Sequence, residues 1–415
     1  MKVRRFTIDT TPLSLSRDFR RIWFGLLFTE LGWQFALVAV FIQIKGLTGS
    51  TSAVGLTGLV WLIGLVAGSL IGGSFLDAYD RRTLLMLAQV GYAASSAVLL
   101  AGALHGRPPV ALIYGAIAVT ALVSAIDGPT RSAMTPRLVG EELLPSALAL
   151  NQVVWNGTGL IGPAIAGFVI QRFGLAWAYG VDLVTYGAMF AAAASIRPME
   201  PELGEGSSSG WTAVKEGFAF VRRSRLLQST FVIDLIAMIF GMPRVLFVFL
   251  ADSQFHRGPA VVGLLFAAPA AGAFLQALSG GWVKHVRHQG RAVIWAVAGW
   301  GAAIAAFGLV GRNLSAALVL LAVAGAADVI SAIFRSTMLQ VMTPDHLRGR
   351  LSGIHILVVT GGPRLGDLEA GLVASWFTPT ISVVSGGLAC ILGAGLCAAV
   401  YPELRRHHAK VKPPG

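Results

Sequence analysis

The sequence predicts an all-α membrane protein with twelve transmembrane helices, arranged as two pseudo-symmetric bundles of six. Of its 415 residues, 55% are hydrophobic and only 13% are charged, whereas soluble domains average about 25% charged residues. Twelve apolar segments follow one another, each close to the roughly 20 residues that a spanning helix needs. A short sequence motif that follows the fourth segment also recurs after the tenth.

Each bundle is predicted from its own run of apolar helical segments. The segments are 20–43, 53–76, 83–104, 109–130, 147–170 and 176–196 in the first bundle, and 228–250, 260–283, 292–311, 315–340, 351–375 and 379–400 in the second. The predicted domains are an N-terminal bundle (1–196), a cytoplasmic linker (197–227), a C-terminal bundle (228–400) and a basic tail (401–415). Within the linker, the helical spacing and basic polar side of "WTAVKEGFAFVRRSRLL" predict a helix on the membrane surface.

The distribution of Lys and Arg predicts the orientation. With the N-terminus inside, the inner segments hold 23 of these residues and the outer loops hold five, so both termini are expected in the cytoplasm. The net charge of +12 would then face anionic inner-leaflet lipid and does not indicate a nucleic-acid partner. The N-terminal stretch is basic and polar, without the apolar core of a cleavable signal peptide.

The two halves of the chain echo each other. "MTPRLVGEELLPSAL" follows the fourth segment, and "MTPDHLRGRLSGI" follows the tenth, at the corresponding position of the second half. A duplicated six-span unit is typical of a secondary transporter, in which the two halves move about a central site.

The loop between the second and third segments carries a charged motif, "GGSFLDAYDRR". Its residues Gly73, Asp77, Arg81 and Arg82 match the pattern G-x-x-x-D-x-x-G-R-[K/R], with Asp80 in place of the second glycine. In this the chain resembles the major facilitator superfamily. The resemblance covers the whole chain and implies the major facilitator fold with alternating access. It also implies that Asp77 latches the loop to a helix of the opposite half; a plain topology loop is the alternative.

A second element, "GPAIAG" in the fifth segment, resembles the core of the antiporter motif through Gly162, Pro163 and Gly167. Together with "PRVLFVFLADSQF" and "TGGPRLGDLEAGL", it makes the chain similar to the drug/proton antiporter branch that contains the enterobactin exporter and the macrolide and Tap efflux proteins. The resemblance implies export across a bacterial inner membrane in exchange for protons.

Ionisable residues inside the apolar segments are the candidate functional residues, because such groups are costly in lipid and usually face a cavity or a partner. Eleven lie within or at the edge of a segment: Arg131, Arg244, Arg335, Arg364, Glu30, Asp127, Asp182, Asp234, Asp328, Asp367 and Glu369. Asp127 and Arg131 are spaced i, i+4, which predicts an intrahelical ion pair; the resemblance implies that they also relay charge to Asp77.

Three acids are the candidate proton-coupling groups. Glu30 lies near the middle of the first segment, Asp234 lies at the corresponding position of the second half, and Asp328 lies deep in the tenth. A carboxyl group in a medium of low dielectric constant binds its proton more tightly, as a proton-carrying group must. Structural acids that hydrogen-bond to a facing helix are the alternative.

The candidate substrate contacts combine one cation with amide and aromatic side chains: Arg244, Trp33, Gln34, Trp155, Phe231 and Phe266. A guanidinium group forms planar hydrogen bonds and stacks on aromatic faces, which suits an anionic or catecholate-bearing compound. The alternatives are that Arg244 reaches the outer headgroups and that the aromatic residues only pack or face lipid.

The sequence does not support enzyme chemistry. It contains no GxxxxGK[S/T] phosphate-binding loop, no set of nucleophile and base, and no cluster of metal ligands, so neither a cofactor nor a metal is expected. We therefore expect a monomeric exporter of a siderophore or an amphipathic drug-like compound whose partners are substrate, protons and lipid. The alternatives are an importer or a lipid or lysolipid flippase on the same fold and, from another class, a channel or a transport-inactive sensor.

Overall fold

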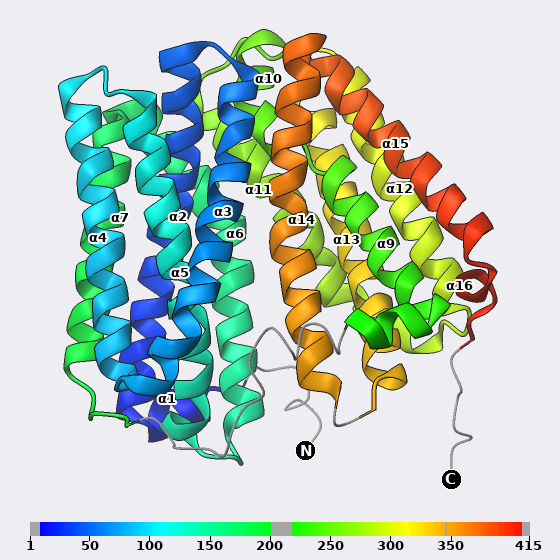
Figure 1. The fold of residues 1–415 in the computed structure, drawn as a ribbon. Helices are drawn as coiled ribbons and strands as arrows, with labels where there is room; N and C mark the ends of the chain where they lie inside the picture. Colours follow the sequence, from blue (N-terminus) through cyan, green and yellow to red (C-terminus); the bar gives the residue numbers. More distant parts are fainter. Residues whose placement is uncertain (1–8, 201–217, 345–346, 409–415) are drawn as a thin grey trace, which may run out of the picture. The chain divides into compact units, whose positions relative to one another are not determined.

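The computed structural model describes residues 9–200, 218–344 and 347–408, without the side chains of 73–77, 284, 348–350 and 352–353. Every element in this part of the chain is a helix (Figure 1). The chain divides into two compact units. The first contains residues 1–47, 60–205 and 259–263, and the second contains 48–59, 206–258 and 264–415.

The first unit is built mainly from long helices of the N-terminal half. They are α1 (Thr11–Leu15), α2 (Arg17–Thr48), the larger part of α3 (Thr51–Ala78), α4 (Arg81–His105), α5 (Val110–Val139), α6 (Leu144–Phe173) and α7 (Leu175–Ala194). Helix α4 packs against both α5 and α7. Leu85, Met134 and Met189 form a fully buried cluster where these three helices meet. This apolar packing holds the polar residues of the same helices in place.

The second unit contains the first part of α3 and the helices of the C-terminal half, except residues 259–263. They are α9 (Arg225–Phe240), η1 (Arg244–Leu246), α10 (Phe247–Ser253), α11 (Pro259–Ser279), η2 (Gly280–His285), α12 (Gln289–Leu309), α13 (Leu314–Met342), α14 (Arg348–Trp376), α15 (Pro379–Val400) and α16 (Pro402–Arg406). Helix α12 packs against α13 and α15, and α14 packs against α9 and α15.

The seventh predicted span is broken. Helix α9 ends at Phe240, and after Gly241 and Pro243 the chain continues as η1 and then α10. Proline has no backbone N–H and cannot continue a regular helix. Trp300 of α12 donates its indole N–H to the Gly241 carbonyl oxygen at 2.7 Å. The break is therefore secured by a neighbouring helix.

All twelve predicted spans coincide with helices of the structure. Ten helical segments of the described residues are long and apolar enough to cross a membrane, and the two remaining predicted spans are α7 and α14. Asp182 lies in α7, and the charged sequence around Asp367 lies in α14, so these residues lower the hydropathy of both helices. The first seven residues of the predicted surface helix, 211–217, lie outside the described residues, while 218–223 are helical and α9 begins at Arg225.

Candidate functional site

An ion-paired cluster lies in the first unit, formed by Glu30 of α2 with Asp127 and Arg131 of α5. We call it the Arg131 cluster. Arg131 Nη2 lies 2.6 Å from Asp127 Oδ2 and 3.8 Å from Glu30 Oε1, so the predicted i, i+4 pair is present. The Asp127 side chain is 2% exposed, whereas that of Glu30 is 19% exposed. Gln89 of α4 donates to Asp127 Oδ1 at 3.4 Å.

A second cluster, which also combines one arginine with two acidic residues, lies in the second unit. Its members are Asp234 of α9 with Asp328 and Arg335 of α13, and we call it the Arg335 cluster. Arg335 forms a direct ion pair with Asp234, while Asp328 Oδ1 lies 3.9 Å from Arg335 Nη2. The Asp234 side chain is 2% exposed and that of Asp328 is 25% exposed. Both clusters therefore combine one guanidinium with a tightly paired, buried carboxyl group and a looser, more accessible one.

A small cavity adjoins the Arg335 cluster. It is lined by Thr230, Phe231, Asp234, Arg335, Leu339 and His355. The Phe231 ring meets the His355 ring edge-on at 6.4 Å. Phe231, a predicted substrate contact, thus lines the same cavity as Asp234, a predicted proton-coupling acid.

Arg244 of η1 contacts a third buried acid, Asp367 of α14. Its Nη2 lies 3.0 Å from Asp367 Oδ2, and Arg364 Nη1 lies 3.7 Å from the same oxygen. The Asp367 side chain is fully buried, whereas that of Arg244 is 22% exposed. Arg244 Nε has no hydrogen-bond partner among the described residues. Asp367 thus holds Arg244 in position and leaves one edge of its guanidinium unsatisfied.

The charged loop after α3 contacts the end of α7. Gly73 and Asp77 lie in α3, but their side chains are outside the described residues, so the predicted latch stays a prediction. Asp80 caps α4 by accepting a hydrogen bond from the Thr83 amide at 3.0 Å. Its other carboxylate oxygen accepts from the Met199 amide. The aspartate that replaces the usual glycine of the motif therefore ties the loop to the segment that follows α7.

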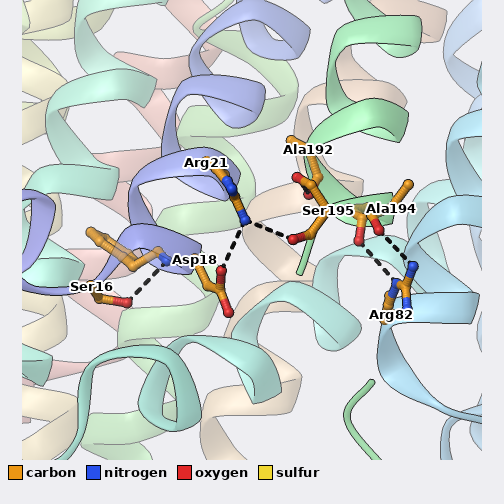
Figure 2. A network of polar contacts seen from close by, with 9 residues as sticks. Ser16, Asp18, Arg21, Arg82, Ala192, Ala194 and Ser195 are labelled. Carbon is orange, nitrogen blue, oxygen red and sulfur yellow. Dashed lines mark hydrogen bonds and ion pairs between the residues drawn. The ribbon is translucent and has the colours of Figure 1, made fainter. Parts of the chain in front are cut away.

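Two arginines donate to the carbonyl groups at the end of α7 (Figure 2). Arg82 donates to the carbonyl oxygens of Ala193 at 3.2 Å and Ala194 at 2.6 Å, and Arg21 of α2 donates to that of Ser195 at 2.7 Å. The last carbonyl groups of a helix lack partners within it and carry partial negative charge. Arg81 of the same loop donates to the Ala133 carbonyl oxygen of α5 at 3.2 Å. Both motif arginines thus bind helix carbonyl groups.

The "GPAIAG" element lies in α6 at two close contacts. A Cβ on Gly162 would lie 2.7 Å from Cγ of Gln34, a predicted substrate contact on α2, and a Cβ on Gly167 would lie 2.5 Å from the Pro259 carbonyl oxygen. A Cβ on Gly263 would likewise clash with the Pro163 carbonyl oxygen. The motif's glycines are therefore required where α6 meets α2 and the first turn of α11, which belongs to the first unit.

Three further predicted substrate contacts differ in burial and packing. Trp33 of α2 is half-buried, Trp155 of α6 is exposed, and Phe266 of α11 packs edge-on against Phe247 at 5.2 Å. Their assignment to substrate stays a prediction. Sequence reasoning missed the pairing of Asp234 with Arg335 and of Arg244 with Asp367, because neither pair is close in sequence.

The family model described as "Transmembrane secretion effector" matches residues 9–413, almost the whole chain. The chain belongs to this family. It is one of the major facilitator superfamily transporters, so this chain is a multi-pass secondary transporter and not an enzyme. The resemblance recognised in the sequence is thereby confirmed.

Curated relatives of this secretion effector include the enterobactin exporter EntS of Shigella boydii. It is 27% identical over 419 residues, which cover 98% of this chain and 97% of the relative. EntS of Escherichia coli O139:H28 matches with the same identity and coverage.

Solved structures show the fold. The nucleoside transporter NupG aligns with a TM-score of 0.73 at 12% identity, covering 93% of this chain and 98% of that one. A bacterial homologue of the iron transporter ferroportin aligns with a TM-score of 0.69 at 14% identity, covering 94% and 99%. The predicted fold class, an all-helical membrane protein with the major facilitator fold, is confirmed.

Proposed function

We propose that this transporter exports a siderophore or another amphipathic small molecule from a bacterial cell in exchange for protons. The direction and the class of substrate are supported by the similarity to EntS along nearly the full length of both chains. Multi-pass insertion in the inner membrane, with both termini in the cytoplasm, is part of the same proposal.

The observation that carries the proton coupling is the excess of carboxyl groups in two clusters. The Arg131 and Arg335 clusters each place two acids beside one guanidinium. An ionised carboxylate and a guanidinium neutralise each other, and a second carboxylate adds an unbalanced negative charge in a region of low dielectric constant. Each cluster can therefore bind one proton while its arginine remains paired.

The distances indicate which acid takes that proton. Glu30 and Asp328 are the loosely paired and more exposed members of their clusters, at 3.8 and 3.9 Å from the arginine. Protonating either one leaves the tighter pair, Arg131 with Asp127 or Arg335 with Asp234, intact. We therefore assign proton exchange to Glu30 and Asp328, and the holding of the arginines to Asp127 and Asp234.

Arg244 supports an acidic or catechol-bearing substrate. Asp367 positions its guanidinium, and the partly exposed side chain remains able to donate to a ligand. Guanidinium groups bind carboxylates and other planar pairs of oxygen acceptors with good geometry. Enterobactin, a catechol siderophore, has groups of this kind.

Inside-out membrane vesicles offer the test. With an imposed inward-acid gradient, vesicles containing the transporter should accumulate iron-free enterobactin, and a protonophore should abolish the accumulation. Arg244→Gln should reduce the uptake, whereas Arg312→Gln, a change in an exposed loop, is the matched control. Uptake that persists without the gradient would contradict proton exchange, and movement of lipid or of small ions instead would favour a flippase or a channel.

A further inference from the structure

Asp182 of α7 is a buried acid of the first unit that belongs to neither cluster. The residue is 1% exposed. Among the described residues no Lys, Arg or His forms an ion pair with it. An ionised carboxylate in such a place is far more costly than a neutral carboxylic acid.

Only one of the two carboxyl oxygens of Asp182 has hydrogen-bond partners in the described part of the chain. Ser96 of α4 donates to Oδ2, and the Tyr186 hydroxyl is also bonded to the carboxyl group. Oδ1 has no hydrogen-bond partner in the described part of the chain. A carboxylate would leave a charged oxygen without a partner here, whereas a carboxylic acid with Oδ2 as its carbonyl oxygen and the proton on Oδ1 leaves only an uncharged O–H group without one, which costs far less.

The backbone of α2 makes room for Oδ1. A Cβ on Gly32 would lie 2.9 Å from this oxygen and 2.2 Å from Oγ1 of Thr185. The carboxyl group therefore occupies space that is available only because residue 32 is a glycine. Gly32 lies two residues after Glu30 on the same helix.

Two stacked tyrosines lie between Asp182 and the Arg131 cluster. The rings of Tyr186 and Tyr92 stack at 5.0 Å with an interplanar angle of 22°. Tyr92 of α4 is in turn hydrogen-bonded to Asp127. A row of polar groups thus runs from Asp182 through α7 and α4 to the ion pair on α5.

The titratable and charged groups around Asp182 and its neighbouring tyrosine pair come from four helices. They are Glu30 of α2, Tyr92 of α4, Asp127 and Arg131 of α5, and Tyr179 and Tyr186 of α7 itself. Tyr179 donates to Gln43 Oε1 at 2.6 Å, so its proton is engaged away from Asp182. The charges of Glu30, Asp127 and Arg131 are therefore the ones that can influence the carboxyl group through the tyrosine pair.

We propose that Asp182 is a further proton-binding site of this transporter, a neutral carboxylic acid whose occupancy is linked through Tyr186 and Tyr92 to the charges of the Arg131 cluster. Loading forms one O–H bond at Oδ1 with a proton from water, and release returns that proton to water. The role in transport rests on the proposed proton exchange, whereas the proton on Asp182 can be measured without transport.

Infrared difference spectroscopy on the full-length protein in lipid nanodiscs detects buried carboxylic acids by their C=O stretch. At neutral pH we expect a band that shifts in D₂O, disappears in Asp182→Asn and persists in Glu30→Gln. Ser96→Ala and Tyr186→Phe retain the carboxyl group but remove a hydrogen bond to its carbonyl oxygen, so each should raise the frequency of the band.

The Ser96 and Tyr186 variants keep the test valid if Asp182→Asn does not fold. A folded Asp182→Asn protein with an unchanged band would overturn the proposal, and so would a band that neither Ser96→Ala nor Tyr186→Phe moves. If the band behaves as expected but a proton gradient does not drive export, the proposed function fails and the proton site remains.

Discussion

Glu30 and Asp127 share Arg131, but they lie at different distances from it and are exposed to different degrees. The looser acid can change its charge without breaking the buried ion pair. The tighter acid cannot, because its neutralisation would leave Arg131 without its close partner. The same difference separates Asp328 from Asp234 around Arg335.

Glu30→Gln mimics the protonated acid and should uncouple transport from protons. Counterflow of labelled against unlabelled substrate in proteoliposomes should persist because it needs no net proton movement, whereas accumulation driven by a pH gradient should fall at least about tenfold, about 1.4 kcal/mol. Asp18→Asn, a change near the start of the same helix, is the control. Gradient-driven accumulation at the wild-type level in Glu30→Gln would refute the role of Glu30.

Asp234→Asn should destabilise the protein much more than Asp328→Asn. Removing one partner of a buried ion pair costs about 3–5 kcal/mol, whereas losing a loose and partly exposed contact costs about 1 kcal/mol or less. Thermal unfolding of the purified variants in detergent compares the two. Equal losses would show that the observed difference in pairing has no energetic consequence.

The ion pairs of the site could be predicted only where the two partners lie close together in the sequence. Asp127 and Arg131 lie on one helix at i, i+4, so helical geometry predicted their contact. The pairings of Asp234 with Arg335 and of Arg244 with Asp367 connect different helices. Helical periodicity cannot predict these pairings because it contains no information on how helices are rotated against each other.

At the scale of elements, the motif loop and the end of α7 act together. Asp80 joins the start of α4 to Met199, while Arg82 and Arg21 donate to the last carbonyl groups of α7. The loop had been predicted as a conformational latch through Asp77. In the described residues it also anchors a helix end within its own unit.

Asp80→Gly, which restores the usual residue of the motif, should loosen this anchor. The change removes the cap of α4 and the hydrogen bond to Met199, and a lost N-cap alone costs about 1 kcal/mol. Hydrogen exchange followed by mass spectrometry should show faster exchange in 195–200 and in the first turn of α4. Asp252→Gly, a change at an exposed position near the end of α10 in the second unit, should leave both regions unchanged; unaltered exchange in Asp80→Gly would contradict the anchoring role.

The broken seventh span shows how much of an element the sequence predicts. Gly241 and Pro243 lie inside the seventh predicted span, 228–250, where proline cannot continue a regular helix, and the structure has a full break there. The sequence did not reveal Trp300 as the partner of the freed carbonyl group. The hydrogen bond of Trp300 connects two helices, as do the ion pairs of Asp234 with Arg335 and of Arg244 with Asp367, which the sequence also did not reveal.

Trp300→Phe keeps most of the buried ring volume but removes the hydrogen bond to the Gly241 carbonyl oxygen. Leaving a buried acceptor unsatisfied costs about 1–3 kcal/mol, so the variant should unfold at a lower temperature. Trp295→Phe, an exposed position on the same helix, is the matched control. If the two variants melt at the same temperature, the hydrogen bond does not secure the break.

At the scale of the molecule, each unit contains one arginine between two carboxyl groups. The fold class and the twelve helical segments were predictable because composition and apolar length determine them. That both clusters combine one arginine with two acidic residues could not be predicted from the sequence, because the contacts between helices were not known. This combination is the physical basis for proposing that each unit binds a proton.

Substrate-dependent proton movement tests this account most directly. Transporter in proteoliposomes that contain a pH-sensitive dye should move protons when iron-free enterobactin is added on the side from which it is transported. The proton signal should disappear in the Glu30→Gln and Asp328→Asn double variant, while substrate counterflow persists. Substrate transport with no accompanying proton movement in the wild-type protein would contradict the account.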